Sequence, residues 1–281
     1  MSSSQIEWRH LNQGPHRIPC PACYRGTKDD AMGLTVHSEG AIWHCFRCGM
    51  AGAERSGVQS IKQSSIPMSF TGKQNETLAP KWSLYFDRLP TLTGTLGEVY
   101  LRSRRCVIPP TSSALRFDPA AWHWPTRSKL PALVALLTDF QDARIQRSLH
   151  FTFLAADGLV KAQVDRNRLM LANHRKFGAV IRLWPDDEVT DGLALAEGIE
   201  SALSAAHIFT PMWATGDAGN MAGLLVVEGI SALTIFADHD KAGLDAAHKL
   251  AERWRAAGQR ARILRAKAVG FDPNDVLKAA T

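Results

Sequence analysis

Four cysteines near the amino terminus are spaced as metal ligands. Two Cys-x-x-Cys pairs, separated by a 21-residue insert, comprise Cys20, Cys23, Cys45 and Cys48. Four thiolates in such pairs can occupy the corners of a tetrahedron, the geometry of structural zinc sites. The alternatives are a disulfide or free core cysteines, and four thiolates leave no vacancy for His37 or His44. Because double pairs without a secretion signal favour metal, we predict a zinc ribbon that binds structural zinc.

Three acidic side chains follow apolar runs typical of buried strands. Glu197 follows Leu-Ala-Leu-Ala, whereas Asp238 and Asp240 follow Leu-Thr-Ile-Phe-Ala. Open α/β sheets place their ligand sites at the carboxyl ends of strands. Asp238 and Asp240, two residues apart, would point to the same side and repel each other unless a cation lies between them. Carboxylates are ligands that Mg²⁺ prefers. Ordinary turn chemistry is the alternative, since Asp and Gly are common at strand ends.

Basic residues are concentrated in the middle of the chain. Residues 141–184 contain eight Lys or Arg and three Asp. Such cations bind nucleic acid by displacing counterions from phosphate, and interleaved phenylalanines could stack on bases. The alternative is a solvated outer face over core-facing aromatic residues. The candidates for nucleic-acid or nucleotide binding are Arg102, Arg104, Arg144, Arg147, Lys161, Arg166, Arg168, Lys176, Arg182 and Lys241.

The elements that must position these residues change along the chain. We expect a zinc ribbon at 1–56, a polar linker at 57–80, a basic α+β subdomain at 81–188 and a parallel-sheet α/β domain at 189–281. Before residue 189, we expect helical structure at 81–105, with a break near Pro90, and strands at 150–154, 159–164 and 179–183. From residue 192, strands and helices alternate, with helices at 199–206 and 241–258 and a last short helix after Pro273.

Bulk composition restricts the class of protein. The 281 residues carry a net charge of +6, which favours a polyanionic partner such as nucleic acid. No apolar run approaches the roughly 20 residues that span a bilayer, and the first ten residues contain no apolar signal core. We therefore expect a cytoplasmic protein with no membrane partner.

The acidic motifs also resemble a known family. Leu193–Ala205 and Leu233–Ala251 resemble the Toprim domain of bacterial primases, type IA topoisomerases and related nucleases. The match is nearest to primase-like proteins of plasmids, prophages and other mobile elements, in which a zinc ribbon precedes Toprim. The resemblance implies a catalytic metal site of Glu197, Asp238 and Asp240 for Mg²⁺ or Mn²⁺, with a supporting role for Asp272 or Asp275. Arg105 departs from the family pattern, which usually has Gly at that position.

By resemblance, the chain is a DNA primase-like nucleotidyltransferase that synthesises short primers on single-stranded DNA during replication. Its partners would be the template, nucleoside triphosphates and a separate helicase, because no P-loop is present. Glu197 would complete the metal site or assist proton transfer from the attacking hydroxyl. The alternatives are a Toprim-type metal-dependent nuclease and a non-catalytic, zinc-dependent DNA-binding adaptor. A topoisomerase is disfavoured, since all three tyrosines precede the acidic motifs.

Overall fold

The computed structural model describes residues 6–24, 26, 29–38, 40–45, 50–55, 75–266 and 273–274. The chain divides into two compact units, residues 1–69 and 70–281. Cys48, Asp272, Asp275 and most of the predicted linker lie outside the described residues. In the described part of the chain, no helix has the length and apolar character to cross a bilayer.

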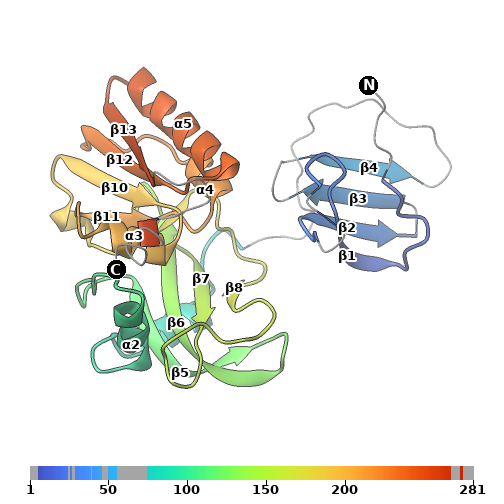
Figure 1. Cartoon of the computed structure of the whole chain (residues 1–281), viewed down its shortest axis with the longest axis horizontal. Coiled ribbons are helices and arrows are strands. Elements are labelled where there is room, and N and C mark those ends of the chain that lie inside the picture. Colours follow the sequence, from blue (N-terminus) through green and yellow to red (C-terminus); the bar gives the residue numbers. More distant parts are fainter. Residues whose placement is uncertain are drawn as a thin grey trace. The chain divides into compact units, whose positions relative to one another are not determined.

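The first unit contains a four-stranded antiparallel sheet. Its strands β1 (Gly14–Ile18), β2 (Met32–His37), β3 (Gly40–Cys45) and β4 (Ala51–Arg55) lie in sequence order (Figure 1). The hairpin of β2 and β3 lies in the insert between the cysteine pairs and ends at Cys45. Its small core contains Trp8, Met32 and Leu34 together with Cys20 and Cys45, so the cysteines join the core to the predicted metal site.

One mixed sheet runs through the whole second unit. Its order is β13-β12-β10-β11-β9-β6-β7-β8, and β5 pairs with β6 (Figure 1). The strands β10 (Gly192–Ala196), β11 (Met212–Ala214), β12 (Ala232–Ala237) and β13 (Arg260–Arg265) are parallel. Strand β9 (Ala179–Arg182) runs antiparallel to both β11 and β6 and joins the two halves of the sheet.

Helices cover both faces of the parallel part, as the alternating pattern predicts. On β10, Ala194 and Ala196 pack towards α3 (Ile199–Ala205), whereas Leu193 and Leu195 pack towards the opposite face. That face is covered by α4 (Ala218–Gly223) and α5 (Lys241–Ala256). Helix α5 ends at Ala256, shortly before Gly258, whose φ of 81° suits glycine.

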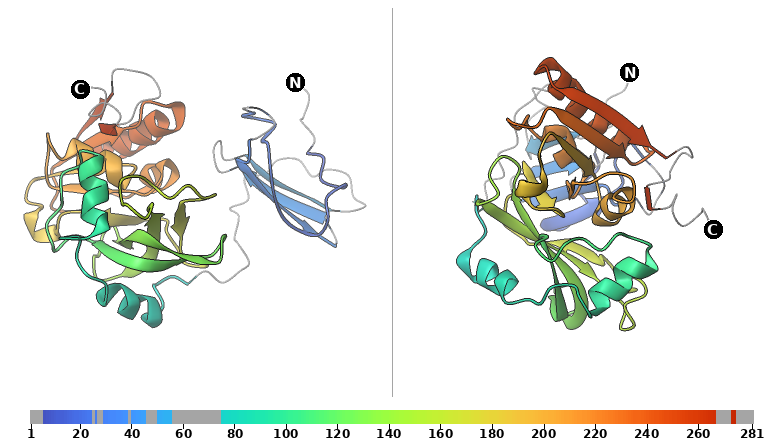
Figure 2. Two further views of the ribbon diagram at one scale, coloured as in Figure 1. Left: turned by 60° about the horizontal axis from the view of Figure 1, so that its bottom comes forward. Right: turned by 90° about the vertical axis from the view of Figure 1, so that its left-hand side faces the viewer.

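The antiparallel part consists of β5 (Leu115–His123), β6 (Ser128–Asp139), β7 (Gln146–Phe153) and β8 (Arg168–Met170). Alternate residues of β6 enter two different cores: Leu133 and Leu137 pack with α2 (Leu96–Ser103), and Val134 and Leu136 pack with α1 (Pro80–Asp87). The two helices therefore lie on opposite faces of this sheet (Figure 2).

The local structure differs in part from the expectations. Residues 159–164 form no strand, because Leu159 and Val160 are exposed and only an isolated bridge joins Lys161 to Leu154. The long hairpin of β5 and β6 and the short helix α4 were not expected from the sequence. Of the helix expected after Pro273, only residues 273–274 are described, and they are helical.

Candidate functional site

The predicted acidic residues lie at the point where the strand order of the parallel sheet reverses. From β10 the chain moves to β11 on one side and later to β12 on the other, so the switch point lies between β10 and β12. The pairing of these strands ends with Ala196 opposite Phe236. Glu197 and Asp238 therefore leave adjacent strands at the same edge, the position at which open α/β sheets bind ligands.

The carboxyl group of Glu197 is partly buried and experiences the charges of three other acidic residues. Burial raises its pKa, as do the negative charges of Asp238, Asp217 and Asp240, in that order, and the pKa reaches about 7. A hydrogen bond from the backbone N–H of Ala218 acts in the opposite direction. The site thus concentrates negative charge that the described side chains balance only in part.

Asp217 is a fourth acidic residue that sequence reasoning missed. It follows β11 and caps α4 by accepting a hydrogen bond from the Asn220 N–H at 2.8 Å. Its other oxygen accepts a hydrogen bond from Lys176 Nζ at 2.7 Å. The signal was weaker than for the other acids, since Thr-Gly-Asp follows an apolar run of only three residues, Met-Trp-Ala. We call Glu197, Asp217, Asp238 and Asp240 the acidic edge.

Helix α5 fixes the positions of the two aspartates. Asp240 is its N-cap, and Oδ1 of Asp240 accepts a hydrogen bond from the Gly243 N–H at 2.8 Å. A Cβ on Gly243 would lie 2.7 Å from the backbone oxygen of Asp238. Glycine at this position therefore lets the first turn of α5 lie directly against Asp238.

The acidic edge is more open than a closed coordination shell. Among the described residues, only Cys20, Cys23 and Cys45 bring three ligand atoms of His, Cys, Asp or Glu within 4.8 Å of one another. No three of the four acidic residues bring their carboxylate oxygens within that distance of one another.

The three described cysteines have the spacing of a tetrahedral thiolate site. The Sγ atoms of Cys23 and Cys45 are 3.6 Å apart. That separation is far longer than a disulfide bond of about 2.05 Å and close to the ~3.8 Å edge of a tetrahedron with 2.3 Å Zn–S bonds. The triad therefore has the ligand type and geometry for zinc.

A buried ion pair holds α3 behind the acidic edge. Glu200 Oε1 accepts hydrogen bonds from Tyr100 Oη at 2.7 Å and from Lys161 Nζ at 2.6 Å. Burial alone would raise the pKa of Glu200, but the charge and hydrogen bond of Lys161 and the hydrogen bond from Tyr100 outweigh it and lower the pKa to about 2. The pair ties the first turn of α3 to α2 and to the segment after β7.

Several predicted phosphate-binding residues have acidic partners inside the chain. Besides Lys161 and Lys176, ion pairs join Arg102 to Glu98, Arg144 to Asp142, Arg147 to Asp139, Arg182 to Asp186 and Lys241 to Asp245. Arg182 is buried, and its guanidinium group also lies 4.4 Å from the ring centre of Trp213. Arg166 and Arg168 are exposed, and no acidic side chain of the described residues forms an ion pair with either.

Comparisons with solved structures find similar folds at low identity. A DNA primase domain from Pseudomonas aeruginosa is 15% identical, with 71% of this chain and 74% of that chain covered and a TM-score of 0.47. The zinc-binding and RNA polymerase domains of the Aquifex aeolicus primase are 15% identical, with coverage of 96% and 78% and a TM-score of 0.46. The primase fragment of the bacteriophage T7 primase-helicase protein is 14% identical, with coverage of 94% and 95% and a TM-score of 0.42.

Two family models match the sequence of the second unit. No curated protein matches the chain. Residues 81–183 match a domain of unknown function, DUF7146, and residues 192–281 match the Toprim domain. The expected resemblance to Toprim is therefore confirmed. The chain carries a Toprim domain at residues 192–281, preceded by a DUF7146 domain at residues 81–183 and a zinc-ribbon-like cysteine triad.

Proposed function

We propose that this protein is a metal-dependent nucleotidyltransferase of the DNA primase type, which synthesises short oligonucleotides on a single-stranded DNA template. The observation that carries the proposal is the acidic edge at the switch point of a Toprim sheet. Joining two nucleotides requires a site that tolerates the charge of a triphosphate, and several carboxylates at one edge of a sheet can do so with bound cations.

The residues of the acidic edge fit Mg²⁺ or Mn²⁺. Carboxylate oxygens are the ligands that these ions prefer. Burial, and after it the charges of Asp238, Asp217 and Asp240, raise the pKa of Glu197, and a cation would balance those charges. We assign Glu197, Asp238 and Asp240 to metal binding, with Asp217 beside them and already paired with Lys176. Bound divalent ions would neutralise charge on the attacking and leaving oxygens of the phosphoryl transfer.

The rest of the chain supplies binding and orientation. Exposed cations of the middle segment, Arg166 and Arg168 among them, hold the phosphates of the template, and Lys176 and Lys241 lie beside the acidic residues. The cysteine triad with Cys48 binds structural zinc, and the ribbon contributes to reading the template. The protein acts in the cytoplasm and takes helicase activity from a separate partner.

Substitution of one acidic residue tests the proposal. Asp238→Asn keeps the shape of the side chain but removes its charge, so we expect oligonucleotide synthesis to fall at least ~100-fold while the fold is retained. The assay uses defined single-stranded templates, labelled nucleoside triphosphates and Mg²⁺ or Mn²⁺. Asp187→Asn is the matched control, because Asp187 is an exposed aspartate away from the acidic edge.

The assay separates the rival functions by their products. Shortened strands that depend on Asp238 and on a divalent ion would identify a nuclease, because water then replaces the nucleotide hydroxyl. Binding without turnover, insensitive to divalent ions, would identify an adaptor. Full synthesis by the Asp238→Asn variant would falsify the assignment of the acidic edge.

A further inference from the structure

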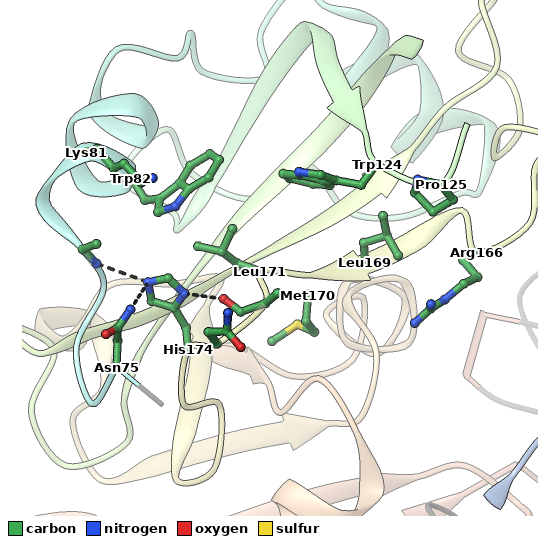
Figure 3. A pocket seen from close by; sticks show the side chains of 13 residues that line it. Asn75, Lys81, Trp82, Trp124, Pro125, Arg166, Leu169, Met170, Leu171 and His174 are labelled. Carbon is green, nitrogen blue, oxygen red and sulfur yellow. Dashed lines mark hydrogen bonds between the residues drawn. The ribbon is translucent and has the colours of Figure 1, made fainter. Parts of the chain in front are cut away.

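A pocket outside the acidic edge combines aromatic rings with cations. It has a volume of about 620 Å³ and lies between α1, the turn after β5 and strand β8 (Figure 3). That volume falls within the roughly 300–1,000 Å³ of small-ligand sites. We call it the tryptophan pocket, after Trp82 and Trp124, which line it with Lys81, Arg166, Leu171 and His174.

The two indole rings form a firm apolar surface. Their centres lie 6.3 Å apart with the planes at 62°, so the rings meet edge to face. Phe151 supports Trp124 at 5.5 Å, and Tyr85 supports Trp82 at the same distance. Trp124 is nevertheless 41% exposed. A large ring that is fixed from behind and open in front is suited to stacking by a flat partner.

The charges of the pocket select an anionic partner. None of the lining residues is acidic, and Lys81 and Arg166 lie at opposite ends with the indole rings between them (Figure 3). Within the described residues, neither cation forms an ion pair with an acidic side chain. Arg166 is held in a left-handed conformation, with φ of 60°, and its carbonyl oxygen is 3.4 Å from Nε2 of the buried His123. The turn that carries Trp124 and the loop that carries Arg166 are thus joined.

One loop connects this pocket to the acidic edge. His174 lines the pocket, and its Nδ1 and Nε2 lie within hydrogen-bonding distance of Ala172 O and Ala79 N. Two residues later, Lys176 bonds to Asp217 of the acidic edge. The backbone between His174 and Lys176 spans at most about 7 Å, so one short loop contributes a residue to each site.

We infer that the tryptophan pocket binds an unpaired base within a single strand of nucleic acid, with the base against the indole rings and the flanking phosphates near Lys81 and Arg166. A duplex exposes no ring face for such stacking, and a mononucleotide has phosphate on only one side of its sugar, whereas the pocket has a cation at each end. The inference rests on the proposed function, because it names where the template strand is held.

Binding of a labelled dT15 oligonucleotide to the full chain tests this inference. Fluorescence anisotropy is measured without added divalent ions or nucleoside triphosphates, so the result does not depend on what reaction the acidic edge performs. We expect Trp124→Ala to raise Kd about tenfold. The matched control is Trp122→Ala, which removes an indole that is 44% exposed and does not line the pocket; its Kd should stay within about twofold of the wild type. Arg166→Gln should lower the slope of log K against log salt by about 0.7.

Photocrosslinking of the unmodified protein gives a second measurement that needs no variant. A strand with 5-iodouracil at its centre should crosslink to Trp82 or Trp124, as mapped by mass spectrometry, and dTMP at the same nucleotide concentration should not displace it. Equal Kd values for the two tryptophan variants, or crosslinks that avoid both residues, would overturn the inference and leave the proposed function standing. Displacement by dTMP would also overturn it, since the pocket would then bind mononucleotides. If Trp124→Ala weakens binding but the protein shows no reaction that depends on Asp238, only the proposed function would be overturned.

Discussion

At the scale of single residues, the acidic edge brings together negative charges that repel one another. Glu197 experiences three neighbouring carboxylates, but Asp217 is partly balanced by Lys176. We expect Asp217→Asn to reduce synthesis less than Asp238→Asn does. It should raise the Mg²⁺ concentration for half-maximal synthesis several-fold, because it removes one negative charge near the ion. A magnesium titration of both variants measures this difference, and an unchanged midpoint for Asp217→Asn would contradict it.

Gly243 sets how closely α5 approaches Asp238. Replacing glycine by alanine inside a helix ordinarily stabilises it by up to about 1 kcal/mol. Here the new Cβ would lie 2.7 Å from a backbone oxygen that cannot rotate away. We therefore expect Gly243→Ala to destabilise the second unit by about 1–3 kcal/mol and to lower the activity of the acidic edge. Urea denaturation and the synthesis assay measure both effects, with Lys249→Ala, at an exposed position of α5, as the control. A gain in stability would contradict the close approach.

The ion pair of Glu200 and Lys161 should make the free energy of unfolding depend on pH. The folded protein lowers the pKa of Glu200 from 4.5 to about 2. This carboxylate therefore contributes stability that is fully present above pH about 4.5 and is lost as the pH falls towards 2, an effect of about 3 kcal/mol. Urea denaturation between pH 7 and pH 3 should show this decline in the wild type and a shallower one in Glu200→Gln. Equal declines in both proteins would mean that other groups dominate.

At the scale of elements, strand β9 joins the two halves of the sheet, and Arg182 secures it. Its guanidinium donates to Thr138 Oγ1 and to the carbonyl oxygens of Asp139 and Phe140, besides its ion pair with Asp186. We expect Arg182→Gln to lower the free energy of unfolding by about 3 kcal/mol, because the buried acceptors lose their donor. Arg168→Gln, at an exposed position of β8, should change it by no more than about 0.5 kcal/mol. Similar urea midpoints for the two variants would contradict the structural role of Arg182.

The sequence predicts the parallel elements better than the antiparallel ones. Strands β10 and β12 are buried on both faces, so continuous apolar runs of strand length mark them. Strand β6 is also buried on both faces, but its run contains Pro131, a residue that is uncommon inside a central strand. Residues 159–164 show the reverse error, because Leu159 and Val160 are exposed although they are apolar. The local pattern of apolar residues does not show which other segments a strand packs against in the folded chain.

The same limit applies to the candidate site. Acidic residues that end long apolar runs were found, whereas Asp217 follows a strand of only three residues and was not selected. The partners of Lys161 and Lys176 lie 39 and 41 positions away in the sequence, so their ion pairs follow from topology alone. The roles of Glu197, Asp238 and Asp240, the cations assigned to phosphate and the predicted domain boundaries stay predictions.

At the scale of the whole molecule, the two units differ in what stabilises them. Among its described residues, the second unit contains three clusters of buried apolar residues around its long sheet. The described part of the first unit has one small cluster, in which two of the eight buried members are the cysteines Cys20 and Cys45. A core of that size supports a fold only weakly, so a bound metal ion should contribute much of the stability of the first unit.

Metal removal should therefore unfold one unit and spare the other. We expect one zinc ion per chain in the full-length protein. Stripping it with a chelator at neutral pH should abolish amide hydrogen-exchange protection in β2 and β3 while β10 and β12 keep theirs. Cys23→Ser should have the same selective effect without a chelator, because it removes one thiolate of the triad. Cys106→Ser is the matched control, since Cys106 lies buried in the second unit near α3. Protection that persists in β2 and β3 after zinc is gone would show that the small core suffices without metal.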